Sequence, residues 1–291
     1  RKYNLNAKIV HTKTEDDVTL AGALFSTIAD TPSNISALLF FHGDGGNFYN
    51  PLYLKMGEIL SREGITFLSA NRRGHDTISS TGNPDVKGGY AFESVSQSPL
   101  DIQAWINFLA TKGHQAIAVG GHSGGAVRAI YAQSTSQFSN VKALIPVSPG
   151  EYNHEGIVEL HGEKFKEFFS LAELSIANGN PEQLLQPGLP WGSTWAAASF
   201  VDCFNKDDRY QMSRHALAIQ IPTLFIFGQL ETKIGDPQEL PVCGLACRTI
   251  EKHIGTHSPH LSLKMVESAN HGYAGRETNL YNAIQGFLKG L

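Results

Sequence analysis

The sequence predicts an α/β protein built on a doubly wound, mostly parallel β-sheet. From residue 36 onward, short apolar runs of four to seven residues alternate with amphipathic stretches of ten or more. Runs that are apolar on both faces are typical of parallel strands covered by helices. A glycine-rich turn follows one of these runs and precedes a helix-like segment. The chain has 291 residues and 41% hydrophobic content, which is enough to enclose a full core.

The elements follow in order along the chain. Two strands are predicted first, at 3–11 and 18–25, with a turn at 15–17 between them. The apolar runs that predict further strands are 36–41, 65–70, 116–119, 141–147, 222–227 and 260–266. Helix-like segments lie near 52–63, 98–111, 125–136, 207–219 and 277–289. In a sheet of this kind, the functional residues sit at the carboxyl ends of the strands.

The alternation of strands and helices is interrupted once, between Gly150 and Asp208. Apolar residues recur there at helical spacing, and Trp191 and Trp195 follow them. We interpret residues 151–207 as a helical lid, inserted between two parts of the core at 1–150 and 208–291. An ordinary peripheral layer of helices is the alternative interpretation.

The composition argues against nucleic acid or an anionic membrane as a partner. The formal net charge is −4, only 17% of residues are charged, and the longest basic run is the pair Arg72 and Arg73. The longest uncharged stretch, 183–201, contains too many polar residues to span a membrane. Three cysteines are too few for a disulfide framework, which favours the cytoplasm. The chain begins at Arg1, so a removed signal peptide is the alternative to a cytoplasmic location. The oligomeric state is left open, with a homodimer as one alternative.

Gly121, Ser123 and Gly125 form a G-x-S-x-G pattern between an apolar strand and a helix-like segment. Such a turn lifts the serine above the sheet, where free N–H groups of the helix start point to the same place. A Cβ at either flanking glycine would collide with the neighbouring strand or helix. A dinucleotide-binding turn does not fit here, and at 43–48 its third glycine position is Phe48. The pattern predicts Ser123 as a nucleophile.

From about residue 36 onward, the chain resembles the α/β-hydrolase superfamily. Four pieces carry the resemblance, in the family's order: FHGDGG at 41–46, NRRGH at 71–75, GHSGG at 121–125 and NHG at 270–272. The first two are similar to those of uncharacterised microbial members, some of them similar to esterases that act on ester-linked siderophores. The resemblance implies an α/β-hydrolase fold and a catalytic triad in the chain order serine, acid, histidine.

The resemblance implies His271 as the general base, because this residue follows the last predicted strand and precedes the final helix. A serine hydroxyl needs such a base within hydrogen-bond reach. His122 adjoins Ser123, but neighbours on a strained turn point apart, so we expect it to pack beside the site. His42 and His75 close two strands, and we expect them to orient loops through hydrogen bonds.

The resemblance also implies that the triad acid follows the strand at 222–227. Glu231 occupies the family's position in the loop at 229–236, although most relatives carry aspartate there. Asp236 lies five residues further on and is the alternative. The resemblance therefore implies a Ser-His-Glu triad with Glu231 as the acid, and Asp236 stays the alternative.

Two backbone N–H groups normally stabilise the oxyanion that forms in acyl transfer. We expect them at Gly124, next to the nucleophile, and at Asp44, in the loop after the strand at 36–41. A carboxylate beside a forming oxyanion is unusual, so the Asp44 side chain either bonds to its own loop or selects a cationic or hydroxyl-rich substrate. The residues expected in the substrate pocket are His42, Gly43, His122, Trp191 and Trp195.

Cys243, Cys247 and three histidines fall within residues 243–260. Their spacing matches none of the common zinc patterns, and the resemblance places a crossover helix here, so no metal is expected. No cofactor is expected either. The predicted reaction is hydrolysis of a small-molecule carboxylic ester or lactone through an acyl-enzyme. The same triad on this scaffold also supports cleavage of C–C or amide bonds or acyl transfer, and a non-catalytic ligand-binding protein is a third alternative.

Overall fold

The computed structural model describes residues 7–27, 34–186, 192–255 and 258–291. Its centre is an eight-stranded sheet with the strand order β1-β2-β4-β3-β7-β8-β9-β10. β1 and β2 pair antiparallel, as do β2 and β4, and every pair from β4 to β10 is parallel. In chain order, the strands of this sheet are β1 Lys8–Lys13, β2 Thr19–Phe25, β3 Ala37–Phe41, β4 Thr66–Ala70, β7 Ile117–His122, β8 Val141–Val147, β9 Thr223–Gly228 and β10 Leu261–Val266. The mostly parallel sheet predicted from the apolar runs is confirmed.

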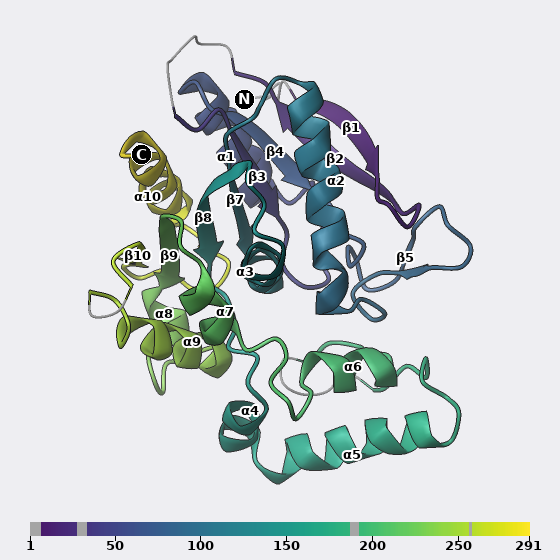
Figure 1. Cartoon of the computed structure of the whole chain (residues 1–291). Helices are drawn as coiled ribbons and strands as arrows, with labels where there is room; N and C mark the ends of the chain where they lie inside the picture. The colour runs from purple at the N-terminus through teal and green to yellow at the C-terminus, as the bar shows by residue number, and fades with distance from the viewer. Residues whose placement is uncertain (1–6, 28–33, 187–191, 256–257) are drawn as a thin grey trace.

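Helices cover both faces of the sheet (Figure 1). Leu38 and Phe40 of β3 pack with α1 and α10, whereas Leu39 and Phe41 pack with α2, α3, α7 and α9. This alternation explains why the strands are apolar at every position. The helices of the core are α1 Pro51–Arg62, α2 Ser98–Thr111, α3 Gly124–Ser136, α7 Met212–Ala218, α8 Gln229–Thr232, α9 Pro241–Glu251 and α10 Glu277–Lys289. Within the described ranges, no helix is long and apolar enough to cross a membrane.

Several boundaries differ from the predicted ones. β1 begins at Lys8, and the start of the strand expected at 3–11 lies outside the described residues. β7 continues through both glycines to His122, because they pair with Ile145 and Pro146 of β8. α7 is shorter than the helix expected at 207–219, since Asp208 has a positive φ of 52° that interrupts the helix. The short connections β5 Ser79–Ser80 and β6 Lys87–Gly88 and the 3₁₀ turn η1 Val95–Gln97 have no counterpart in the predicted elements.

The segment 151–207 contains α4 His154–His161, α5 Glu163–Ala177 and α6 Ala197–Cys203. Figure 1 shows these three helices as a separate layer next to the carboxyl ends of the central strands. Asp202 of α6 anchors this layer to the core, because its carboxylate accepts hydrogen bonds from Ser94 at 2.5 Å and Tyr210 at 3.0 Å. The helical structure expected between Gly150 and Asp208 is thus present at α4, α5 and α6.

Glu151, which links β8 to this layer, predicts a pH dependence of stability. Burial raises the pKa of its carboxyl to about 7, although Ser213 N donates to Oε1 at 3.3 Å. Between the unfolded value of 4.5 and pH 7 only the folded state holds this proton, so the free energy of unfolding should fall by about 3 kcal/mol as pH rises. Glu151→Gln should abolish that fall, measured by urea unfolding at pH 5 and 8. The exposed Glu155→Gln is the control, and an unchanged slope in Glu151→Gln would contradict the assignment.

Candidate active site

Ser123 lies on a strained turn between β7 and α3. Its φ of 55° and ψ of −124° place it in a sparsely populated backbone region. A Cβ added to Gly121 would lie 2.5 Å from the carbonyl carbon of Gly125, and one added to Gly125 would lie 2.3 Å from His42 O. Both flanking positions therefore require glycine, as the sequence predicts. The turn places Ser123 on the wall of a pocket at the carboxyl end of β7.

His271 lines the same pocket as Ser123 and is bound to a buried carboxylate. Its Nδ1 lies 2.6 Å from Oε2 of Glu231, which is fully buried. A carboxylate oxygen can only accept here, so Nδ1 carries the proton and Nε2 is free to accept one. Asp236, the alternative acid, faces Lys233 at 3.6 Å and accepts from Gln238 N at 3.0 Å. Glu231 lies in the short helix α8 rather than in the expected loop.

The Glu231 carboxylate is held by donors on its second oxygen. Gly228 N and Ser148 Oγ each donate to Oε1 at 2.6 Å. Because Ser148 gives its only proton to Glu231, the Tyr273 hydroxyl is the donor in its 2.8 Å hydrogen bond with Ser148 Oγ. Ser148 and Tyr273, like Ser123, have positive φ values, of 49° and 56°. The backbone is therefore strained at the nucleophile and at two residues that hold the acid.

Removing the hydroxyl of Ser148 is expected to reduce activity by loosening Glu231. A hydrogen bond to a charged group contributes roughly 1.5–3 kcal/mol, so Ser148→Ala should lower kcat about tenfold or more. Ester hydrolysis at saturating substrate measures this effect. Ser61→Ala is the matched control, because Ser61 is also buried and bonds to a backbone carbonyl of α1. Equal activity of the two variants would show that Ser148 does not position Glu231.

His122 connects the base to the loop after β3. Its Nε2 lies 2.7 Å from the carbonyl oxygen of His271, which fixes Nε2 as a donor and leaves Nδ1 to accept from the Tyr53 hydroxyl at 3.0 Å. Burial, with a smaller contribution from the neighbouring His271, lowers the pKa of His122 to about 3. A histidine with both nitrogens engaged in this way is a packing partner of the site, the place the sequence predicts for it.

The pocket has a volume of about 460 Å³, which is within the size range of small-molecule sites. Of the residues expected in it, Gly43 and His122 line the pocket. His42 does not: it is fully buried and bonds to Gly43 O at 2.8 Å. Trp195 is also absent from the lining and packs against Tyr90, with the ring centroids 4.5 Å apart.

Trp191 lies outside the described residues. The segment 151–207 instead reaches the pocket through Tyr152 and Ser193. Val242 and Cys243 of α9 also line the pocket, as does Leu240, the residue before this helix.

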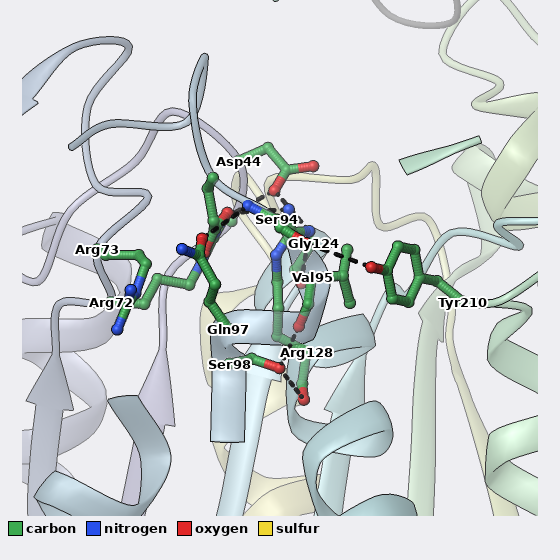
Figure 2. A network of polar contacts seen from close by, with 12 residues as sticks. Asp44, Arg72, Arg73, Ser94, Val95, Gln97, Ser98, Gly124, Arg128 and Tyr210 are labelled. Atoms are coloured by element: carbon green, nitrogen blue, oxygen red, sulfur yellow. Dashed lines mark hydrogen bonds and ion pairs between the residues drawn. The ribbon is translucent and has the colours of Figure 1, made fainter. Parts of the chain in front are cut away.

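Asp44 and Gly124, the expected oxyanion donors, also line the pocket. Within the described part of the chain, the backbone N–H of neither residue has a hydrogen-bond acceptor. The Asp44 carboxylate is bound on Oδ1 by Arg72 Nη2 at 2.7 Å and Arg128 Nη1 at 3.1 Å (Figure 2). The Tyr152 hydroxyl donates to Oδ2 at 3.0 Å. The carboxylate thus bonds to arginines and a tyrosine from other segments, which neither sequence alternative described.

Sequence reasoning missed three residues of the site. Ser148 gave no signal, because a serine after a strand has no distinctive neighbourhood. Arg128 did give one, since it is the only charged residue within the apolar segment 124–132 of α3. The sequence predicts neither a metal site nor a disulfide at Cys243 and gives it no other role, yet this residue lines the pocket, with its Sγ 3.9 Å from His271 Nδ1. Cys243 and Cys247 both lie on α9 and are free thiols.

Comparisons with known proteins identify the fold. No family model matches the chain, and no curated protein matches it. Among solved structures, DcsB in complex with its substrate analogue has a TM-score of 0.71 at 15% identity, with 98% of this chain and 99% of that chain covered. The α/β hydrolase GrgF from Penicillium sp. sh18 has a TM-score of 0.69 at 17% identity, with 98% of each chain covered.

An esterase from Pyrococcus furiosus has a TM-score of 0.59 at 18% identity, with 98% of this chain and 91% of that chain covered. At these identities the likeness defines the fold. The chain has the α/β-hydrolase fold, as the sequence resemblance implied.

Proposed function

We propose that the protein is a serine hydrolase that cleaves a small-molecule carboxylic ester or lactone with Ser123, His271 and Glu231. The observation that carries the proposal is the 2.6 Å contact between His271 Nδ1 and Glu231 Oε2, in a pocket that Ser123 also lines. This contact leaves Nε2 as the free acceptor on the base, which is the arrangement that activating a serine requires. The esterase among the proteins of similar fold supports the choice of an ester.

In the proposed reaction, Ser123 Oγ attacks the carbonyl carbon of the ester while His271 Nε2 takes the hydroxyl proton. The carbonyl oxygen becomes an oxyanion, which the backbone N–H groups of Asp44 and Gly124 would stabilise. When the tetrahedral intermediate collapses, Nε2 gives its proton to the leaving alcohol and an acyl-enzyme remains. Water then attacks the acyl carbon while His271 Nε2 takes one of its protons, and a second tetrahedral intermediate forms. When this intermediate collapses, Nε2 returns the proton to Ser123 Oγ and the acid is released. Glu231 stays ionised and stabilises the imidazolium in both steps.

We also propose that the segment 151–207 acts as a lid that shapes the pocket. Tyr152 and Ser193 contribute to its wall, and the layer of α4, α5 and α6 lies next to the carboxyl ends of the strands. The lining also includes the apolar side chains of Leu240 and Val242. A lining of this kind suits a substrate with an apolar acyl or alcohol group of modest size.

A fluorophosphonate probe followed by a substrate panel tests this function. The probe should label the wild-type protein at Ser123 and leave Ser123→Ala unlabelled, as read by peptide mass spectrometry. p-Nitrophenyl esters of graded chain length should then be cleaved faster than the matched anilides. Absence of labelling would indicate a non-catalytic binding protein, and faster cleavage of the anilides would indicate an amidase.

A further inference from the structure

Four charged side chains form a closed cluster directly behind the proposed oxyanion hole. Arg72 and Arg128 both bind Asp44 Oδ1, and both bind Oε2 of Glu93, with Arg128 Nη2 at 2.9 Å. The side chains of Arg72, Glu93 and Arg128 are at most 2% exposed, and that of Asp44 is 8% exposed. Two cations and two anions are thus buried together with no net charge.

The cluster contacts both backbone segments that would stabilise the oxyanion. Arg128 Nη1 donates to Gly124 O at 3.2 Å and also lies 3.1 Å from the Asp44 carboxylate. A Cβ added to Gly124 would lie 1.9 Å from Asp44 Oδ1, so this carboxylate is packed against the residue that follows the nucleophile. Figure 2 shows Arg128 and Arg72 approaching Asp44 beside Gly124. One guanidinium therefore joins the loop after β3 to the first turn of α3.

Stability alone is a weak reason for such a cluster. Burying four charges carries a desolvation penalty that their mutual attraction offsets only partly, and apolar replacements are often as stable. Within the described residues, Arg72 Nε, Arg128 Nε and Glu93 Oε1 also have no hydrogen-bond partner. Arg128 Nη2 is in ion-pair contact with Glu93 but makes no hydrogen bond within these residues. The two guanidinium groups nevertheless keep Glu93 ionised: burial opposes ionisation, but Arg128 and Arg72 lower the pKa of this carboxyl. A permanently charged arrangement at this place suits a role in the reaction.

We propose that Arg128 is a positioning residue of the oxyanion hole, which holds the Gly124 and Asp44 backbones in place and neutralises the Asp44 carboxylate beside the developing negative charge. This inference rests on the proposed function. It explains how a carboxylate can lie next to an oxyanion: Arg128 and Arg72 bind it from behind, so that its charge does not oppose the reaction.

Variants that change the net charge of the cluster test this proposal. Arg128→Met leaves the cluster with one net negative charge and frees the Gly124 carbonyl. It should lower kcat for p-nitrophenyl acetate by about 10²- to 10³-fold, as loss of an oxyanion-hole donor does, with KM changed less than threefold. Asp44→Asn in this background restores neutrality beside the oxyanion and should recover kcat at least tenfold. Glu93→Gln in the same background restores neutrality away from the pocket and should not recover it.

Arg73 provides a matched control. Like Arg128, it is a buried arginine held by two carboxylates, which are Asp101 at 2.8 Å and Asp16 at 2.7 Å. It does not line the pocket. Arg128→Lys and Arg73→Lys each keep the charge and lose the planar fork. Both should lower the melting temperature, but only Arg128→Lys should lower kcat, by at least tenfold. This pair decides the question if Arg128→Met does not fold.

Two sets of results would overturn the inference. One is an Arg128→Lys variant with kcat within threefold of wild type. The other is equal recovery by Asp44→Asn and Glu93→Gln, which would mean that Arg128 only balances charge in the core. Ser123→Ala is measured in the same assay: if it is inactive while Arg128→Lys is fully active, only this inference fails. If Ser123→Ala is as active as wild type, the proposed function fails and this inference fails with it.

Discussion

Ser123→Ala is expected to lower kcat for ester hydrolysis by about 10⁶-fold, the loss seen when the nucleophile of a triad that works as a unit is removed. The reason is that alanine has no hydroxyl that could attack the carbonyl carbon and give its proton to His271. KM should change little, because the pocket walls at Gly43, Tyr152 and Val242 are untouched. Steady-state kinetics on a p-nitrophenyl ester measure both quantities.

The Ser123→Ala protein should remain folded, which makes the result interpretable. Ser123 is half-buried, and its backbone N–H donates to Val147 O at 2.8 Å, a hydrogen bond that alanine keeps. The strained φ is the same for alanine as for serine, so the melting temperature should stay close to that of wild type. Ser134→Ala, which removes a hydroxyl bonded to His215, is the control. A folded Ser123→Ala protein that keeps a tenth of wild-type turnover would mean that another group is the nucleophile.

The sequence predicts the sheet well because burial on both faces leaves a pattern that is local. Leu38, Leu39, Phe40 and Phe41 are all apolar since each faces a helix layer. The turn at Ser123 is predictable for a similar reason, because its flanking glycines are required by collisions within a few residues of the turn and the adjacent strand. Local constraints of this kind can be read from neighbouring positions.

What the sequence does not predict depends on contacts between distant positions. Asp44 is bound by Arg72, 28 residues away, and by Arg128, whose place on an apolar helix only suggests that it has a buried partner. Trp195 illustrates a different difficulty. A tryptophan in an insert is expected to avoid water, but the sequence does not say whether it does so in the pocket or, as observed, against Tyr90.

Glu231 and Asp236, the two candidate acids of the triad, lie in different environments. Glu231 is fully buried beside His271, whereas Asp236 lies on a partly exposed loop and pairs with Lys233. A fully buried carboxylate is unfavourable unless it is paired and accepts hydrogen bonds. Glu231 meets both conditions through His271 and through the Gly228 and Ser148 donors. The extra methylene of glutamate lets one oxygen reach these donors while the other faces the imidazole.

Glu231→Gln is expected to lower kcat by about 10⁴-fold, by analogy with other triads whose acid is replaced by its amide. Glutamine keeps the size of the side chain but can place an NH₂ group toward His271 Nδ1, which would favour the tautomer with the proton on Nε2. That tautomer cannot accept the Ser123 proton, and the imidazolium loses its counter-charge. Asp236→Asn, the matched loop control, should stay within about threefold of wild type, because the contacts of its carboxylate are to the exposed residues Lys233 and Gln238 and not to His271. Comparing kcat of the two purified variants from pH 6 to 9 decides between the two acids. An inactive Asp236→Asn protein together with a normally active Glu231→Gln protein would transfer the role of the acid to Asp236. The roles of Ser123 and His271 would be unaffected.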